Sequence, residues 1–186
     1  MSNRSGRIEI IVGPMFCGKS EELIRRLRRV MVAKLPMKVF KADLDKRYDN
    51  GDKISSHSRY EVEATPVSVE DPYVILDLID KDTQVVGIDE IQFFPSEIIS
   101  ICMYMAKIGI RVILSGLDMD YRGTPFGSVP TLMAVAERVD KLTSICTVCG
   151  RDATRTQKLT SDGELVDIGQ DDKYTACCVR HHSIPK

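Results

Sequence analysis

The chain has 186 residues, of which 43% are hydrophobic, and its formal net charge is −1. This length suits one domain with a small appended module, and the near-neutral charge argues against binding to nucleic acid or an anionic membrane through a basic surface. No apolar run approaches the ~18 residues of a membrane span, and the polar segment 1–7 does not resemble a signal peptide. We therefore expect a cytoplasmic protein with reduced cysteines.

The first apolar segment, 8–12, predicts a strand, and a helix is predicted at 21–34. Between them lies a complete phosphate-binding loop, Gly13-Pro14-Met15-Phe16-Cys17-Gly18-Lys19-Ser20. Its backbone N–H groups can surround a polyphosphate, Lys19 can reach the outer phosphates, and the Ser20 hydroxyl suits Mg²⁺. A glycine-rich turn without a ligand is the alternative, but the order of strand, loop and helix favours a site for a nucleoside triphosphate.

The segments that follow predict alternating strands and helices. Strands are expected at 37–42, 84–88 and 111–117, and helices at 70–80 and from Pro95 to Gly109. The polar segment 43–63 predicts a surface loop that could become ordered around a ligand. This alternation behind a phosphate-binding loop indicates an α/β fold with a mostly parallel sheet and a ligand site at the carboxyl ends of its strands.

Two adjacent acids, Asp89 and Glu90, end the apolar strand predicted at 84–88. Asp89 suits the Mg²⁺ of a bound triphosphate, and Glu90 is the neighbouring candidate for a general base. An acidic, solvated strand end is the alternative, which the phosphate-binding loop makes less attractive. The residues alone leave two roles open for Glu90, because such a group orients water in ATPases and accepts a proton from a substrate hydroxyl in kinases.

Two clusters near the end of the sequence predict a metal site. Cys146 and Cys149 are separated by two residues, and Cys178 and His181 repeat this spacing. A Cys₃His set binds Zn²⁺ as a tetrahedron with no position left for a substrate, so we expect a structural zinc ion. The neighbouring Cys177 and His182 are alternative ligands, and a group of free thiols is the alternative to a metal site.

A small β module is predicted between the two clusters. Segments 154–160 and 165–169 resemble strands joined by a turn at Asp162-Gly163. Zinc would stabilise such a hairpin despite its small size. We expect loss of the metal to disorder this module and to leave ligand binding at the distant phosphate-binding loop largely preserved.

These motifs, in this order, resemble those of the cytosolic (type II) thymidine kinases. The resemblance rests on the phosphate-binding loop, Asp89-Glu90-Ile91-Gln92-Phe93-Phe94, Leu117-Asp118, Pro125-Phe126-Gly127 and the paired zinc-ligand clusters. Many families share the loop, whereas the Asp-Glu-x-Gln-Phe-Phe strand end joined to this zinc module is far more selective. The resemblance implies a RecA-like P-loop NTPase core at 1–142, a zinc-ribbon β domain at 143–186, and a homotetramer.

The same resemblance implies transfer of the ATP γ-phosphoryl group, with Mg²⁺, to the 5′-hydroxyl of thymidine or deoxyuridine, with Glu90 as proton acceptor. ATP would contact residues 13–20 and Asp89, Glu90, Ile91 and Gln92. The pyrimidine would be enclosed by Met15, Phe93, Leu117, Tyr121, Phe126, Thr156, Leu165, Val166, Asp167, Ile168, Gly169 and Tyr174. Arg47 matches a position associated with the nucleotide phosphates. His181 and Gln170 depart from the family, where Cys and Gly are common.

Two other classes of protein fit parts of the sequence. A zinc-ribbon P-loop ATPase acting on nucleic acid would need a basic face, which the near-neutral charge disfavours. A regulatory nucleotide-binding module without catalysis is disfavoured by the intact set of Lys19, Ser20, Asp89 and Glu90.

Overall fold

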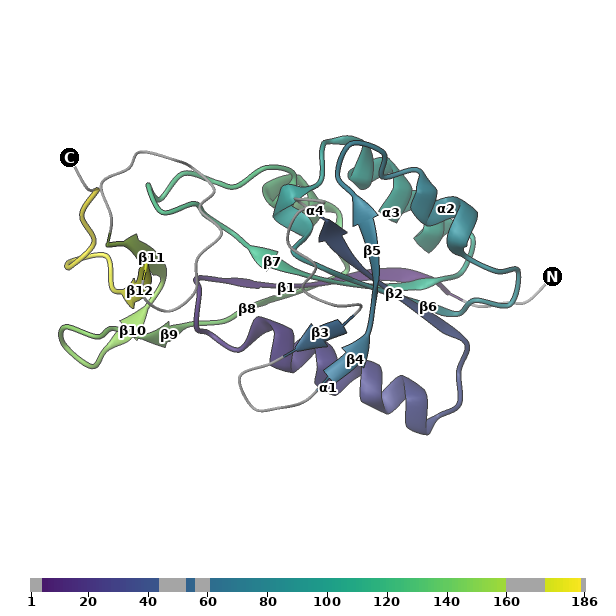
Figure 1. Cartoon of the computed structure of the whole chain (residues 1–186), viewed down its shortest axis with the longest axis horizontal. Coiled ribbons are helices and arrows are strands. Elements are labelled where there is room, and N and C mark those ends of the chain that lie inside the picture. The colour runs from purple at the N-terminus through teal and green to yellow at the C-terminus, as the bar shows by residue number, and fades with distance from the viewer. Residues whose placement is uncertain (1–4, 44–52, 56–60, 160–172, 185–186) are drawn as a thin grey trace.

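The computed structural model describes residues 5–43, 53–55, 61–159 and 173–184 (Figure 1). In these residues a six-stranded sheet runs in the order β5 (Thr65–Ser68), β2 (Met37–Asp43), β6 (Val85–Asp89), β7 (Arg111–Leu117), β1 (Arg7–Gly13) and β8 (Arg138–Lys141). Every neighbouring pair in this sheet is parallel. The predicted α/β fold with a mostly parallel sheet is therefore confirmed.

Helices cover both faces of the sheet (Figure 1). One face is covered by α1 (Lys19–Val32) together with an antiparallel pair, β3 (Lys53–Ser55) and β4 (Glu61–Glu63). The other face is covered by α2 (Val74–Leu78), α3 (Glu97–Lys107) and α4 (Val129–Val135), and a short 3₁₀ turn at Ile91–Phe93 joins β6 to α3. Because both faces are buried, the central strands β6, β7 and β1 are predominantly apolar.

Strand β1 separates two hydrophobic cores. Ile10 and Val12 pack in the core beneath α3, whereas Ile11 packs with Leu23 and Leu27 of α1. Because side chains on both faces of β1 are covered, the strand is buried on both sides. The phosphate-binding loop starts at its carboxyl end, at residue 13. The loop is thus built on a strand that is held between two hydrophobic cores.

The structure corrects the prediction that 43–63 is only a surface loop. Strands β3 and β4 lie within that segment, and their apolar residues Ile54 and Val62 are buried against α1. The sequence also gave no indication of β5, β8 and α4, which are short.

A C-terminal β module, defined here as β9 (Ser144–Ile145), β10 (Asp152–Ala153), β11 (Arg155–Lys158) and β12 (Tyr174–Cys177), lies beyond the end of the sheet where β1 leads into α1 (Figure 1). Strand β11 falls within the segment predicted at 154–160, and it pairs antiparallel with β12, which the sequence did not indicate. The predicted strand at 165–169 lies outside the described residues, and the division at residues 142 and 143 stays a prediction.

A buried ion-pair network ties α1 to the sheet. The carboxylate of Glu9, on β1, lies 2.7 Å from the guanidinium groups of Arg7 and Arg111 and 3.0 Å from that of Arg26. Arg26 also pairs with Asp140 of β8 at 2.7 Å. Burial alone would raise the pKa of Glu9, but the hydrogen bonds and charges of Arg111 and Arg7 outweigh it and lower that pKa to about 2.

Replacing Glu9 by Gln is expected to lower the free energy of unfolding at pH 7 by about 3 kcal/mol, because it removes the buried carboxylate that three guanidinium groups share, one of which, that of Arg26, is itself buried. Since the pKa in the folded protein lies below the ordinary value of 4.5, the contribution of Glu9 is complete above pH 4.5 and is lost as the pH falls toward about 2. Urea unfolding at pH 7 and pH 3 should therefore show a smaller difference between variant and wild type at pH 3. A difference that stays constant would contradict this role, and the exposed Glu70→Gln is the control.

Candidate active site and metal centre

The phosphate-binding loop leaves β1 with an unusual backbone. Gly13, Phe16 and Gly18 all have positive φ, at 149°, 63° and 82°. A Cβ atom on Gly13 would lie 2.5 Å from the carbonyl oxygen of Leu142, so only glycine fits there. The Lys19 ammonium donates a 2.7 Å hydrogen bond to the Pro14 carbonyl, which holds this lysine against the loop.

The predicted acidic pair lies at the carboxyl end of β6, near the loop. Asp89 is buried and Glu90 is exposed, with Glu90 in the left-handed region at φ 55°. The Gln92 amide donates to Glu90 Oε2 at 2.5 Å, and its oxygen accepts the N–H of Leu117 on β7 at 3.0 Å. A buried glutamine therefore links the Glu90 carboxylate to the neighbouring strand.

Burial, and then the adjacent charge of Glu90, raise the pKa of Asp89 to about 6. The positive charge of Lys19 acts in the opposite direction. Lys19 and Asp89 therefore share one electrostatic environment, although 70 positions separate them in the sequence. A buried carboxylate beside a second acid is a suitable partner for a divalent cation, which would offset both charges.

Two of the side chains expected to enclose a pyrimidine contact each other, and a third is buried. The rings of Phe93 and Phe126 meet edge to face with centroids 5.7 Å apart, whereas Phe94 is buried in the core beneath α3. Tyr121 is buried, and the Lys158 ammonium lies 5.3 Å from its ring centroid. The other described members of the predicted set are Met15, Leu117, Thr156 and Tyr174, of which Thr156 and Tyr174 are buried. Leu165, Val166, Asp167, Ile168, Gly169, Gln170 and Arg47 lie outside the described residues.

The C-terminal β module contacts the phosphate-binding loop directly. Thr156 Oγ1 accepts the Met15 N–H at 3.0 Å, and the Ser144 hydroxyl donates to the Phe16 carbonyl at 3.0 Å. His182 Nε2 lies 2.8 Å from the Tyr121 carbonyl. The expectation that the loop is distant from the module is therefore wrong, because the short strands β9 and β11 begin beside it.

Sequence reasoning missed Ser144 and Lys158 at this junction, and it considered His182 only as an alternative zinc ligand. Lys158 is almost fully buried on the same face of β11 as Thr156, two residues earlier. That two-residue spacing was the available signal, since alternate side chains of a strand share a face. No local pattern indicates Ser144.

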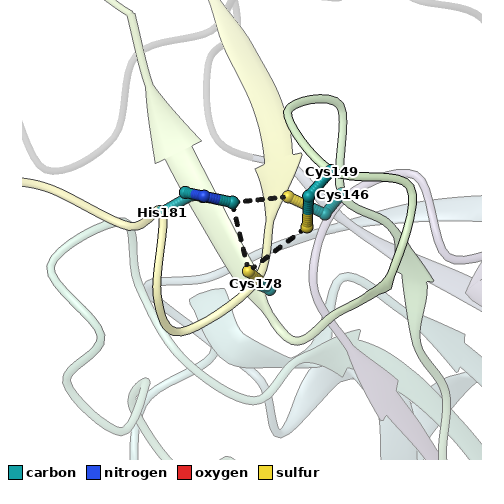
Figure 2. A group of neighbouring side chains, drawn as sticks. All are labelled: Cys146, Cys149, Cys178 and His181. Atoms are coloured by element: carbon teal, nitrogen blue, oxygen red, sulfur yellow. Dashed lines mark hydrogen bonds between the residues drawn. The ribbon is translucent and has the colours of Figure 1, made fainter.

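The candidate metal centre consists of Cys146, Cys149, Cys178 and His181, whose ligand atoms all lie within 4.8 Å of one another (Figure 2). His181 Nδ1 lies 3.4 Å from the Cys178 sulfur and 3.6 Å from the Cys146 sulfur, and the sulfurs of Cys149 and Cys178 are 3.9 Å apart. A tetrahedral Zn²⁺ site, with bonds of about 2.3 Å to sulfur and 2.0–2.1 Å to nitrogen, has ligand separations of about 3.5–3.8 Å. The cluster is compatible with zinc.

The two alternative ligands point elsewhere. The Cys177 sulfur lies 3.9 Å from Gln157 Oε1, and His182 faces Tyr121, so neither belongs to the cluster among the described residues. Burial of Cys146 would raise the pKa of its thiol, but backbone N–H groups and the His181 ring outweigh this and lower the pKa to about 5. The fold therefore favours a thiolate, the form that binds metal.

Among the described residues, no helix has the length and apolar character needed to cross a membrane. Comparison with protein families finds a match to the model described as thymidine kinase, over residues 6–182. This match includes the phosphate-binding loop, the Asp89-Glu90 strand end and all four residues of the candidate metal centre. The chain belongs to the thymidine kinase family.

Proposed function

We propose that this protein transfers the γ-phosphoryl group of ATP to the 5′-hydroxyl of thymidine or deoxyuridine, giving the nucleoside monophosphate and ADP in nucleotide salvage. The family match supports a thymidine kinase. The observation that carries the proposal is the position of Glu90, an exposed carboxylate at the carboxyl end of β6 next to Asp89, whose electrostatic environment includes Lys19.

The phosphate-binding loop and Asp89 would bind the triphosphate. Residues 13–20 offer backbone N–H groups, Lys19 would contact the outer phosphates, and Ser20 and Asp89 would hold the Mg²⁺ that accompanies ATP. When bound, Mg²⁺ would neutralise the negative charge that develops on the phosphoryl oxygens. Burial of Asp89 beside Glu90 fits this role, since such a carboxylate is costly to ionise without a cation.

Glu90 would accept the proton of the 5′-hydroxyl as that oxygen attacks the γ-phosphorus. The Gln92 amide contacts Oε2 of Glu90, which leaves Oε1 for the substrate. Because Gln92 is itself anchored to β7, it would fix the direction of the carboxylate. Positioning matters here because phosphoryl transfer has a loose transition state.

The pyrimidine would lie in an apolar slot containing the Phe93–Phe126 pair, Tyr121 and Met15, with Thr156 at the junction with the C-terminal β module. Such a slot excludes water that would otherwise accept the phosphoryl group. The module would bring residues 165–169 over the base, and a structural Zn²⁺ on the four-residue cluster would stabilise it. By family resemblance we further propose a cytoplasmic homotetramer with domains at 1–142 and 143–186.

Incubation of the purified protein with ATP, Mg²⁺ and a panel of nucleosides tests the proposal. Thymidine and deoxyuridine should be phosphorylated, with one ADP formed per monophosphate, and purine nucleosides should not. ATP hydrolysis without a nucleotide product, stimulated by DNA or RNA, would instead support the zinc-ribbon ATPase.

Replacing Lys19 by Ala is expected to weaken ATP binding and to lower the phosphorylation rate by about 10²- to 10³-fold, because its charge acts in both the ground state and the transition state. Thymidine binding measured without ATP should change little. Calorimetry with each ligand, compared with the exposed Lys107→Ala, separates these effects. Unchanged ATP affinity and turnover would mean that the loop is only a structural turn.

A further inference from the structure

The backbone at Phe16 adopts a conformation that its own side chain does not explain. Phe16 has φ 63°, in the left-handed region that bulky residues rarely adopt, and its side chain is 38% exposed. The ring belongs to neither of the two hydrophobic cores. The Phe16 carbonyl accepts a 3.0 Å hydrogen bond from the Ser144 hydroxyl, and Ser144 is buried on β9.

That hydrogen bond also orients the next N–H group of the loop. In a trans peptide the C=O and N–H of one plane point in opposite directions. Since the Phe16 carbonyl points toward Ser144, the Cys17 N–H points away from the C-terminal β module. Cys17 lies directly before Gly18 and Lys19, in the stretch whose N–H groups would surround a phosphate.

A second peptide plane of the loop is held in the same way. The Met15 N–H donates to Thr156 Oγ1, and the Pro14 carbonyl, on the opposite side of that plane, accepts the Lys19 ammonium. Two hydroxyls of the C-terminal β module therefore contact two alternate peptide planes of the loop. Ser144 and Thr156 lie 128 and 141 positions from their partners in the sequence.

We propose that Ser144 is a positioning residue for ATP: through the Phe16 carbonyl, it makes the C-terminal β module set the geometry of the phosphate-binding loop. This role rests on the proposed function, because it assigns ATP to that loop. Ser144 contacts no phosphate in this arrangement and acts only through the backbone. The module thus serves the ATP site as well as the nucleoside site.

The test compares Ser144→Ala with Thr147→Ala, which removes a hydroxyl from the same module. The Thr147 hydroxyl is exposed and lies 3.2 Å from that of Thr175, within the module. Ser144→Ala is expected to raise the Kd for Mg·ATP about 3- to 10-fold, the effect of one neutral hydrogen bond. The KM for ATP should rise in parallel, whereas the KM for thymidine at saturating ATP, kcat, Tm and zinc content should match those of Thr147→Ala. Ser144→Thr, which keeps the hydroxyl, should restore ATP binding.

An unchanged Kd for Mg·ATP in Ser144→Ala would overturn the proposal. Equal losses of ATP and thymidine binding, together with a Tm below that of Thr147→Ala, would also overturn it, because they would indicate a purely structural role. The same holds if Ser144→Thr loses as much ATP binding as Ser144→Ala. Because the Kd for Mg·ATP is measured without a nucleoside, it remains informative even if the wild-type protein phosphorylates no nucleoside, the result that would refute the proposed function.

Discussion

Replacing Glu90 by Gln is expected to lower the rate of thymidine phosphorylation by about 10²- to 10⁴-fold while ATP and thymidine still bind, because the amide cannot accept the proton of the 5′-hydroxyl. The substitution preserves size, and the amide oxygen can still accept the hydrogen bond from Gln92. Single-turnover rates with both substrates saturating, together with calorimetric Kd values, separate chemistry from binding.

The exposed Glu70→Gln is the matched control, since it removes one carboxylate from a residue outside the candidate active site. Near-normal turnover in Glu90→Gln with thymidine saturating would refute the assignment of Glu90 as base. A loss smaller than about tenfold would mean that Glu90 mainly orients the hydroxyl, which a loose transition state allows.

The backbone of Glu90 gives independent support for a functional role. Its φ of 55° is unusual for a non-glycine residue, and such conformations cluster at active sites because the surrounding structure must maintain them. Here the Glu90 N–H donates to Asp89 Oδ1 at 3.0 Å, and Gln92 contacts the side chain. The strained residue is thus held from both sides at the end of a fully buried strand.

The parts of the structure that the sequence predicts well are those in which a local pattern encodes the geometry. The phosphate-binding loop and the strand and helix around it follow from glycine placement and apolar periodicity, and the observed bounds of β1 and α1 differ from the predicted ones by one or two residues. The metal cluster follows from two repeated spacings, since two intervening residues bring both ligands of a turn to one side.

The parts that the sequence does not predict depend on tertiary contacts. Strands β3 and β4 each bury a single apolar residue, Ile54 or Val62, between polar neighbours, which is too short a pattern to recognise. Strand β8 was not predicted either, because it is an edge strand with mostly polar residues. The contact between Ser144 and Phe16 joins the two-residue strand β9 to the phosphate-binding loop, and neither segment has a periodic pattern, so only the folded chain reveals it.

Loss of zinc is the second large effect that we expect, and the contacts between module and loop change its predicted consequence. Zinc stabilises small modules by about 10 kcal/mol or more, so a Cys178→Ser variant should lose metal and order in the C-terminal β module. Thymidine binding should then become undetectable, because that module supplies Thr156 and Tyr174. The sequence alone predicted that ATP binding would persist. Since Ser144 and Thr156 both contact the loop, we instead expect Mg·ATP to bind about 10- to 100-fold more weakly.

Cys177→Ser is the matched control, because Cys177 is the adjacent buried cysteine and its sulfur faces Gln157 rather than the cluster. Elemental analysis should find about one zinc ion per chain in the wild type and in Cys177→Ser, and none in Cys178→Ser. Retained zinc in Cys178→Ser with loss in Cys177→Ser would move the ligand by one residue. A metal-free protein that binds Mg·ATP as tightly as the wild type would show that the phosphate-binding loop keeps its geometry without the module, and a metal-free protein with full activity would refute the zinc site itself.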